Sequence, residues 1–202
     1  MASVPLRPDQ ESEDRVVEQL RAALDSFATE QGLALATKCQ VFLGVTAGQK
    51  DGRLRWLCQS AQQDLVFYSM KEGLRPINLE ESNLLRRFRG SFSDLEVVFP
   101  LLIFAVKYGS VITHALRQYS EEARLVRWAH PFCQYNLLLI GFPSQRSDVD
   151  KVYMSAKSFD AVLAYPHWPK DQEQVLGDIK RLVQDHLSLL RTNPFYRVHD
   201  LI

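Results

Sequence analysis

Apolar residues recur at helical spacing in two long segments of the chain. In the first segment, apolar positions between Val16 and Phe27 recur every three or four residues, acidic residues precede them and Gly32 follows. This pattern predicts an amphipathic helix over 13–31. A second stripe predicts a helix over 170–191, and its apolar positions are Val175, Leu176, Ile179, Leu182, Val183, Leu187 and Leu190.

Short runs of branched and aromatic residues follow the first predicted helix. Residues 39–46 and 53–59 flank a glycine-bearing segment, and this arrangement predicts a β-hairpin. Residues 65–70 predict a third strand. Asn78 precedes two glutamates, which is typical of a helix cap, and predicts a helix over 79–89.

The most apolar stretch of the chain covers residues 99–116. Its β-branched residues and Pro100 favour two strands, over 95–106 and 111–116, with one long buried helix as the alternative. A short helix is predicted to follow over 120–129, because a proline two residues later discourages its continuation.

The C-terminal third alternates between strand and helix patterns. A strand over 135–142, a helix over 148–157 and a strand over 161–165 precede the long helix. This alternation predicts parallel pairing with a right-handed crossover. The expected fold class is therefore mixed α/β, with antiparallel strands in the N-terminal part and parallel strand–helix–strand–helix units in the C-terminal part.

A length of 202 residues without a linker or an internal repeat favours one α/β domain, which we place over 12–193. Residues 1–11 are polar and contain two prolines, so we expect them to be disordered. Residues 194–202 form an apolar tail after the predicted end of the last helix. Such a tail packs on its own domain or docks on a partner.

The 24 basic and 24 acidic side chains cancel, which argues against a strong overall attraction to nucleic acid or to anionic membranes. Cys39, Cys58 and Cys133 are widely spaced, so they predict reduced thiols rather than disulfides or a zinc cluster. The N-terminus lacks the order of a signal peptide, and Lys107 and His114 interrupt the longest apolar stretch. We expect an intracellular protein, cytoplasmic or nuclear, without a membrane span.

The sequence contains no glycine-rich dinucleotide loop, P-loop, serine-hydrolase elbow, zinc-protease motif or EF-hand loop. We therefore predict no catalytic residues, no cofactor and no metal. Tyr153 and Lys157 form a Tyr-x-x-x-Lys pair that resembles the proton-transfer pair of short-chain dehydrogenases over five residues only. The glycine-rich loop of that family is missing, and an amphipathic helix with a snorkelling lysine explains the pair.

A candidate ligand site lies where one predicted strand passes into a helix, at 144–147, and where the next strand ends, at 166–169. Ligands bind at the carboxyl ends of parallel strands, and helix N-termini there attract anions. The candidate anion-binding residues are Ser144, Arg146, Ser147, His167 and Trp168.

Two further segments have the composition of binding surfaces. Arginines beside aromatic residues suit phosphate, nucleic acid or an acidic partner, although nearby glutamates make a solvated helix face the plainer interpretation. The candidate partner-binding residues are Arg86, Arg87, Arg89, Phe195, Tyr196, Leu201 and Ile202. Arg117, Arg124 and Arg127 extend the arginine pattern along the chain.

The predicted order of helix, three strands, helix and strand resembles the core of restriction-endonuclease-like nucleases. The resemblance concerns topology, because Asp64 is present but an acidic strand end followed by Glu-x-Lys is not. Two-metal cleavage needs those carboxylates.

These observations favour a non-catalytic protein-interaction subunit or adaptor, whose partner is another protein or a second copy of the chain. The alternatives are an enzyme or anion binder that uses the site at 144–147 and 166–169, and nucleic-acid binding through the arginines at 86–89.

Overall fold

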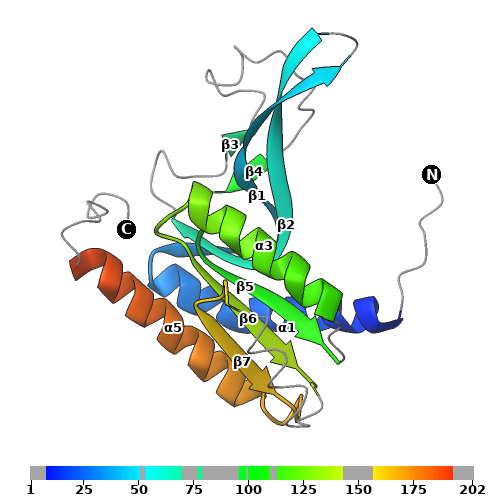
Figure 1. Ribbon diagram of the computed structural model, residues 1–202. Coiled ribbons are helices and arrows are strands. Elements are labelled where there is room, and N and C mark those ends of the chain that lie inside the picture. The colour runs from blue at the N-terminus through cyan, green and yellow to red at the C-terminus, as the bar shows by residue number, and fades with distance from the viewer. Residues whose placement is uncertain are drawn as a thin grey trace.

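Helices cover both faces of a mixed β-sheet in the computed structural model (Figure 1). The structure describes residues 8–50, 53–69, 77–78, 96–98, 100–109, 113–142 and 157–192. Its elements in chain order are α1 (Pro8–Glu30), β1 (Leu33–Lys50), β2 (Arg53–Ser69), β3 (Ile77–Asn78), β4 (Glu96–Val98), β5 (Pro100–Tyr108), α3 (Thr113–Ala129), β6 (Gln134–Ile140), β7 (Ala161–Tyr165) and α5 (Gln172–Thr192).

The strand order in the sheet is β3-β4-β1-β2-β5-β6-β7. The strand β2 pairs antiparallel with β1 and with β5, whereas β5, β6 and β7 run parallel to one another. The expected mixed α/β class is confirmed in these residues. The N-terminal part is not antiparallel throughout, because β4 pairs parallel with β1.

The two faces of the sheet have separate apolar cores. Phe67 and Phe104 meet edge to face, with ring centroids 5.9 Å apart, in the core beneath α1 and α5. On the opposite face, α3 packs over β6 and the middle of β1. Figure 1 shows α3 in front of the sheet and α1 behind it.

The hairpin β1–β2 passes from one core to the other along its length. Leu35 packs beneath α1, whereas Val41 on the same strand packs beneath α3. The change falls at Lys38, which has a φ of 52°, a value that favours glycine or asparagine. The flanking pairs place Lys38 opposite residue 64 of β2. Beyond this point the two strands leave the sheet as a ribbon (Figure 1).

The helix α1 starts earlier than predicted. It begins at Pro8, inside the segment 1–11 that we expected to be disordered. Proline is tolerated in the first turn of a helix because the N–H it lacks has no helical partner there. The prediction for residues 8–11 was wrong for this reason.

The predicted strand over 65–70 is, in its described residues, the C-terminal end of β2 and not a separate element. The predicted strand over 111–116 is wrong for residues 113–116, because α3 starts at Thr113, and residues 111 and 112 lie outside the described part of the chain. Leu116, Ala123 and Val126 are buried at helical spacing, so burial of this side of the helix against the sheet favours the helix.

The C-terminal strands and the last helix agree with the predictions to within two residues, and β6 and β7 are parallel as expected. No helix among the described residues has the length and apolar character needed to span a membrane. The predictions that lie outside the described residues are the helix over 79–89, most of the helix over 148–157 and the tail over 194–202.

We predict that Ile179→Ala lowers the free energy of unfolding by about 2–5 kcal/mol, because Ile179 is fully buried between α5 and the sheet. Leu189→Ala is the matched control. Leu189 lies on the same helix but is 52% exposed, so we expect a change of about 0.5 kcal/mol or less. Urea denaturation of both variants tests this, and equal midpoints would contradict it.

Candidate functional site

The predicted anion-binding residues are only partly described. Ser144, Arg146 and Ser147 lie outside the described residues. The backbone N–H of His167 donates to the Asp171 carboxylate at 2.7 Å, and Trp168 packs against the core beneath α1 and α5. In the described half of this site, these two residues therefore build the turn that leads into α5.

The predicted partner-binding residues at 86–89 and 195–202 lie outside the described residues. Tyr153 does too, whereas Lys157 is described and exposed. The arginines on α3 are described, and they belong to the exposed surface discussed below.

A cluster of charged side chains surrounds the point where the hairpin leaves the sheet. We call it the junction cluster, and its members are Glu13, Asp14, Lys38, Asp64, Lys107 and Tyr119. Lys107 pairs with Glu13 at 2.7 Å, and its ammonium lies 4.7 Å from the centre of the Tyr119 ring. Lys38 pairs with Asp14. The cluster thus joins α1, β1, β5 and α3, elements that are far apart in the sequence.

Asp64 replaces a missing strand partner within the junction cluster. The pairing of β2 with β5 ends at Leu65 and Phe104, so the N–H of Val106 points past the end of the ladder. The Asp64 carboxylate accepts this N–H at 2.9 Å. A buried N–H without a partner costs about 1–3 kcal/mol, so this bond stabilises the point where β2 departs.

The surroundings of Asp64 and Lys107 shift their pKa values. Burial raises the pKa of Asp64, and the Val106 N–H and the Lys107 ammonium only partly oppose this. Burial alone would lower the pKa of Lys107, but its contacts with Glu13 and Tyr119 raise it above the usual value. Burial also raises the pKa of Tyr119. Lys107 and Glu13 are each only 15% exposed, so their ion pair is largely removed from solvent.

The junction cluster bears on the resemblance to nucleases. The fold brings Asp64 close to Lys107. The nuclease motif Glu-x-Lys needs a glutamate two positions before the lysine. In this chain that position is Ala105, which is 1% exposed and carries no carboxylate. Among the described residues, no three His, Cys, Asp or Glu side chains are grouped as metal ligands. The donor set present at this position does not fit two-metal chemistry.

Other buried polar groups hold the fold together. The imidazoles of His130 and His186 lie 2.7 and 2.9 Å from the carbonyl oxygens of Phe42 and Phe132, and burial lowers the pKa of both. Burial raises the pKa of the Cys39 thiol to about 12. A protonated thiol is a poor nucleophile, so Cys39 is not suited to covalent catalysis.

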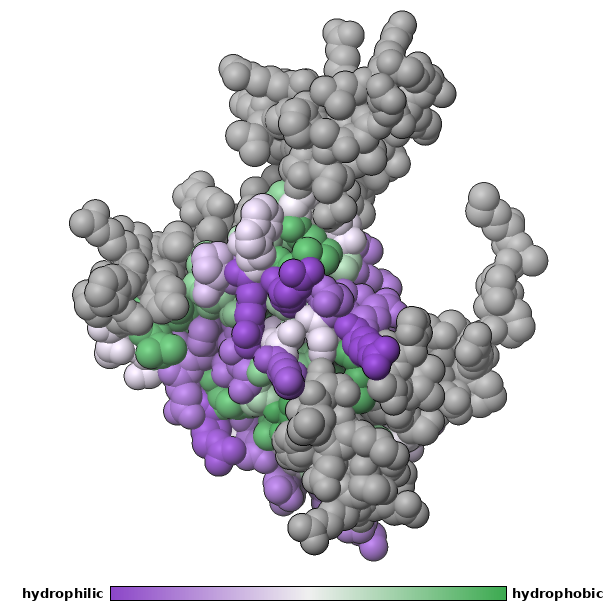
Figure 2. All heavy atoms as spheres, in the orientation of Figure 1, coloured by the Kyte–Doolittle hydropathy of each residue, from purple (hydrophilic) through white to green (hydrophobic). Residues whose placement is uncertain are grey.

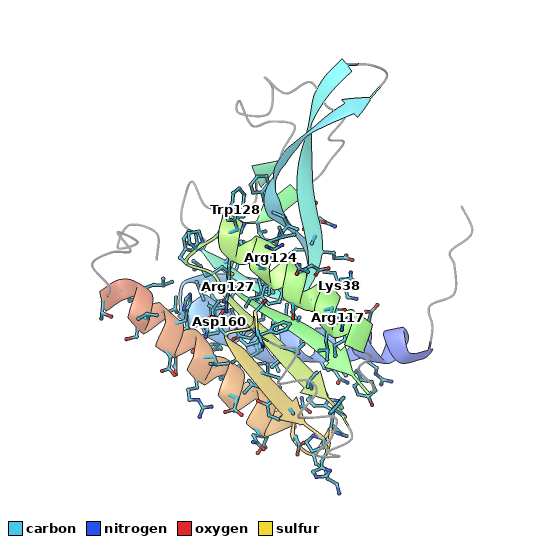
Figure 3. All side chains as sticks on the ribbon, viewed as in Figure 1. Lys38, Arg117, Arg124, Arg127, Trp128 and Asp160 are labelled. Carbon is cyan, nitrogen blue, oxygen red and sulfur yellow. The ribbon has the colours of Figure 1, made fainter. Side chains whose placement is uncertain are left out.

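The outer face of α3 carries a row of exposed side chains. We call it the α3 stripe, and its members are Arg117, Glu121, Arg124 and Trp128. Their spacing of four, three and four residues places them on one side of the helix. Figure 3 shows Arg117, Arg124 and Trp128 following one another along α3, and Figure 2 shows that this face is mostly hydrophilic.

Trp128 is the most unusual member of the α3 stripe. It is 79% exposed, whereas tryptophan is usually highly buried. A Cβ atom at Gly44 would lie 3.7 Å from the Trp128 ring, so the indole stands beside the base of the ribbon. The ring therefore lies next to β1 while much of its surface faces solvent.

The sequence patterns missed both the junction cluster and Trp128. The only signal for Lys107 was its place at the end of an apolar run. The only signal for Asp64 was its place just before another apolar run. Trp128 gave no signal of its own, because a tryptophan at a helix end is usually assigned to the core.

The chain matches no protein-family model, and a search of curated proteins finds no significant relative. The function therefore has to be inferred from the site geometry alone.

We predict that Asp64→Asn is more stable than the wild type at neutral pH. The amide oxygen still accepts the Val106 N–H, and the cost of burying a charge disappears. A raised pKa in the folded state means that the wild type loses stability as the pH rises. The gain should vanish below about pH 4, where Asp64 is protonated in both states. Urea unfolding of both proteins between pH 4 and pH 8 measures this difference. An Asp64→Asn variant that is less stable than the wild type, by a margin that grows with pH, would contradict the prediction.

We also predict that Ala105→Glu destabilises the fold and that Mg²⁺ does not restore it. The new carboxylate would be buried in the core beneath α3 without a cation of its own. Ala105→Leu controls for the added volume. Melting temperatures with and without Mg²⁺ or Mn²⁺ measure the effect. Recovery by either ion would show that the junction cluster completes a metal site.

Proposed function

We propose that the protein is a non-catalytic binding protein, and that it holds another protein chain on the α3 stripe. The observation that carries this proposal is the 79% exposure of Trp128 beside the base of the ribbon. Tryptophan and arginine are the side chains most enriched among residues that dominate binding energy. The α3 stripe contains one tryptophan and two arginines.

The inward face of α3 supports this role. Leu116, Ala123 and Val126 pack on the sheet, so the helix is fixed along its length. A surface that is already rigid loses little conformational entropy when a partner binds. The stripe therefore presents its side chains in one arrangement.

The charged groups of the junction cluster support binding rather than catalysis. Lys107 pairs with Glu13, Lys38 pairs with Asp14, and Asp64 accepts a backbone N–H. Each group thus has a structural partner within the described residues. Catalytic carboxylates need access to a substrate, and these are occupied in joining α1 to the sheet.

The charge distribution favours a protein partner over nucleic acid. Arg124 pairs with Glu121 at 2.8 Å, and Arg127 pairs with Asp160 at 2.6 Å. Nucleic-acid surfaces carry a large excess of basic groups, whereas this face alternates in sign. Aromatic and arginine side chains are enriched at protein interfaces, and the α3 stripe contains both.

We predict that Trp128→Ala weakens binding of the partner by at least about 2 kcal/mol, or about 30-fold. The fold should be unaffected because Trp128 is exposed, so the urea midpoint should change little. Leu189→Ala, which removes the other large exposed apolar side chain of the described residues, is the matched control.

The measurement compares proteins retained by immobilised wild-type, Trp128→Ala and Leu189→Ala chains from an extract of cells that express the protein. Retention that is equal for all three would contradict the proposal. Retention that disappears steeply between about 50 and 200 mM salt would instead indicate nucleic acid.

A further inference from the structure

The α3 stripe is complementary to itself when it is reversed. Read along the chain, its members are Arg117, Glu121, Arg124 and Trp128. An antiparallel second helix with a two-fold axis between residues 122 and 123 places Trp128 opposite the partner's Arg117. The same axis places Glu121 opposite the partner's Arg124. All four positions of the stripe then face a favourable group.

We propose that the protein binds a second copy of itself through antiparallel packing of α3 on α3. This proposal rests on the proposed function, because it names the partner of the same surface. A two-fold dimer uses one surface patch on both chains, so that patch has to complement itself. The reversed stripe meets this requirement.

The centre of the contact is a square of four charges. Within one chain, Arg124 already lies 2.8 Å from Glu121, and both side chains are about two-thirds exposed. In the dimer each arginine also faces the partner's glutamate. Each charge is then adjacent to two opposite charges and to no like charge. A pair that is weak on one exposed helix gains strength when it joins such a network.

Aromatic contacts close the two ends of the stripe. Arg117 is exposed and makes no ion pair with any described residue, so its guanidinium is free to stack. The partner's Trp128 offers the aromatic face that guanidinium groups prefer. Arg117 and Trp128 are eleven residues apart, or about 16 Å along the helix. The two-fold axis brings both ends into contact at once.

The size of this contact sets its strength. The helix α3 has 17 residues, and one helix pair buries an area at the low end of specific interfaces. We therefore expect self-association that depends on concentration rather than a permanent dimer. Figure 2 looks onto this face of the molecule.

Charge reversal tests the pairing directly. Glu121→Arg makes the central square entirely positive, and Arg124→Glu makes it entirely negative. Each variant alone should stay monomeric in sedimentation equilibrium from about 10 µM to about 1 mM, a range in which the wild type self-associates. An equimolar mixture of the two variants should associate again, because each arginine then faces a glutamate of the other chain.

Two controls separate the pairing from general charge effects. Arg21→Glu reverses an exposed arginine of α1 that also pairs with a glutamate three residues away, and it should associate like the wild type. The double variant Glu121→Arg with Arg124→Glu restores the square and should self-associate. Circular dichroism of each variant confirms that the helix content is unchanged.

A wild type that remains monomeric at about 1 mM would overturn the self-pairing, and so would a mixture of the two variants that does not associate. Binding of a different protein to the wild type and not to Trp128→Ala, while the wild type itself stays monomeric, would also overturn the self-pairing. That result would leave the proposed function intact. Unchanged binding in Trp128→Ala would contradict the proposed function itself. The two failures are therefore distinguishable.

Discussion

The rest of the structure depends on the bond between the Asp64 carboxylate and the N–H of Val106. At this point β2 stops pairing with β5, and the hairpin turns its apolar side from α1 toward α3. A strand that leaves a buried sheet abandons a backbone donor, and the donor needs a new acceptor. Asp64 supplies that acceptor, and the unusual φ of Lys38 allows the opposite strand to follow.

The ion pairs around this bond fix the surrounding helices. Glu13 and Asp14 hold the start of α1 against β5 and β1. The reversal also brings Val41 and Leu43 under α3, and so places Gly44 beneath the ring of Trp128. The exposed indole is thus a consequence of the same reversal that occupies the charged groups. The groups of the junction cluster are thus paired inside the fold, whereas the side chains of the α3 stripe are exposed.

Elements with one apolar side could be predicted from the sequence, and elements that change sides could not. The helix α5 keeps one buried stripe from Val175 to Leu190, so periodicity located it. The strand β2 has a mostly polar run from Gln59 to Asp64 between two more apolar segments. Within this run Gln63 is buried, and it accepts a hydrogen bond from the Tyr135 hydroxyl at 2.6 Å. The polar run therefore divided one strand into two predictions. The contact of Asp64 with β5 could not be predicted, since it depends on register between strands more than thirty residues apart.

The α3 stripe was hidden by one wrong element. The sequence patterns predict a strand over 111–116 and a helix only from residue 120. Arg117 then lies outside the helix, so the pattern does not place it on the same side as Glu121, Arg124 and Trp128. Once the helix begins at Thr113, the buried positions Leu116, Ala123 and Val126 define its inner side. Trp128 is two residues beyond Val126, about 200° around the helix, and therefore on the outer side. The Trp128 ring therefore lies outside the apolar core beneath α3, and the proposed binding role rests on this exposure.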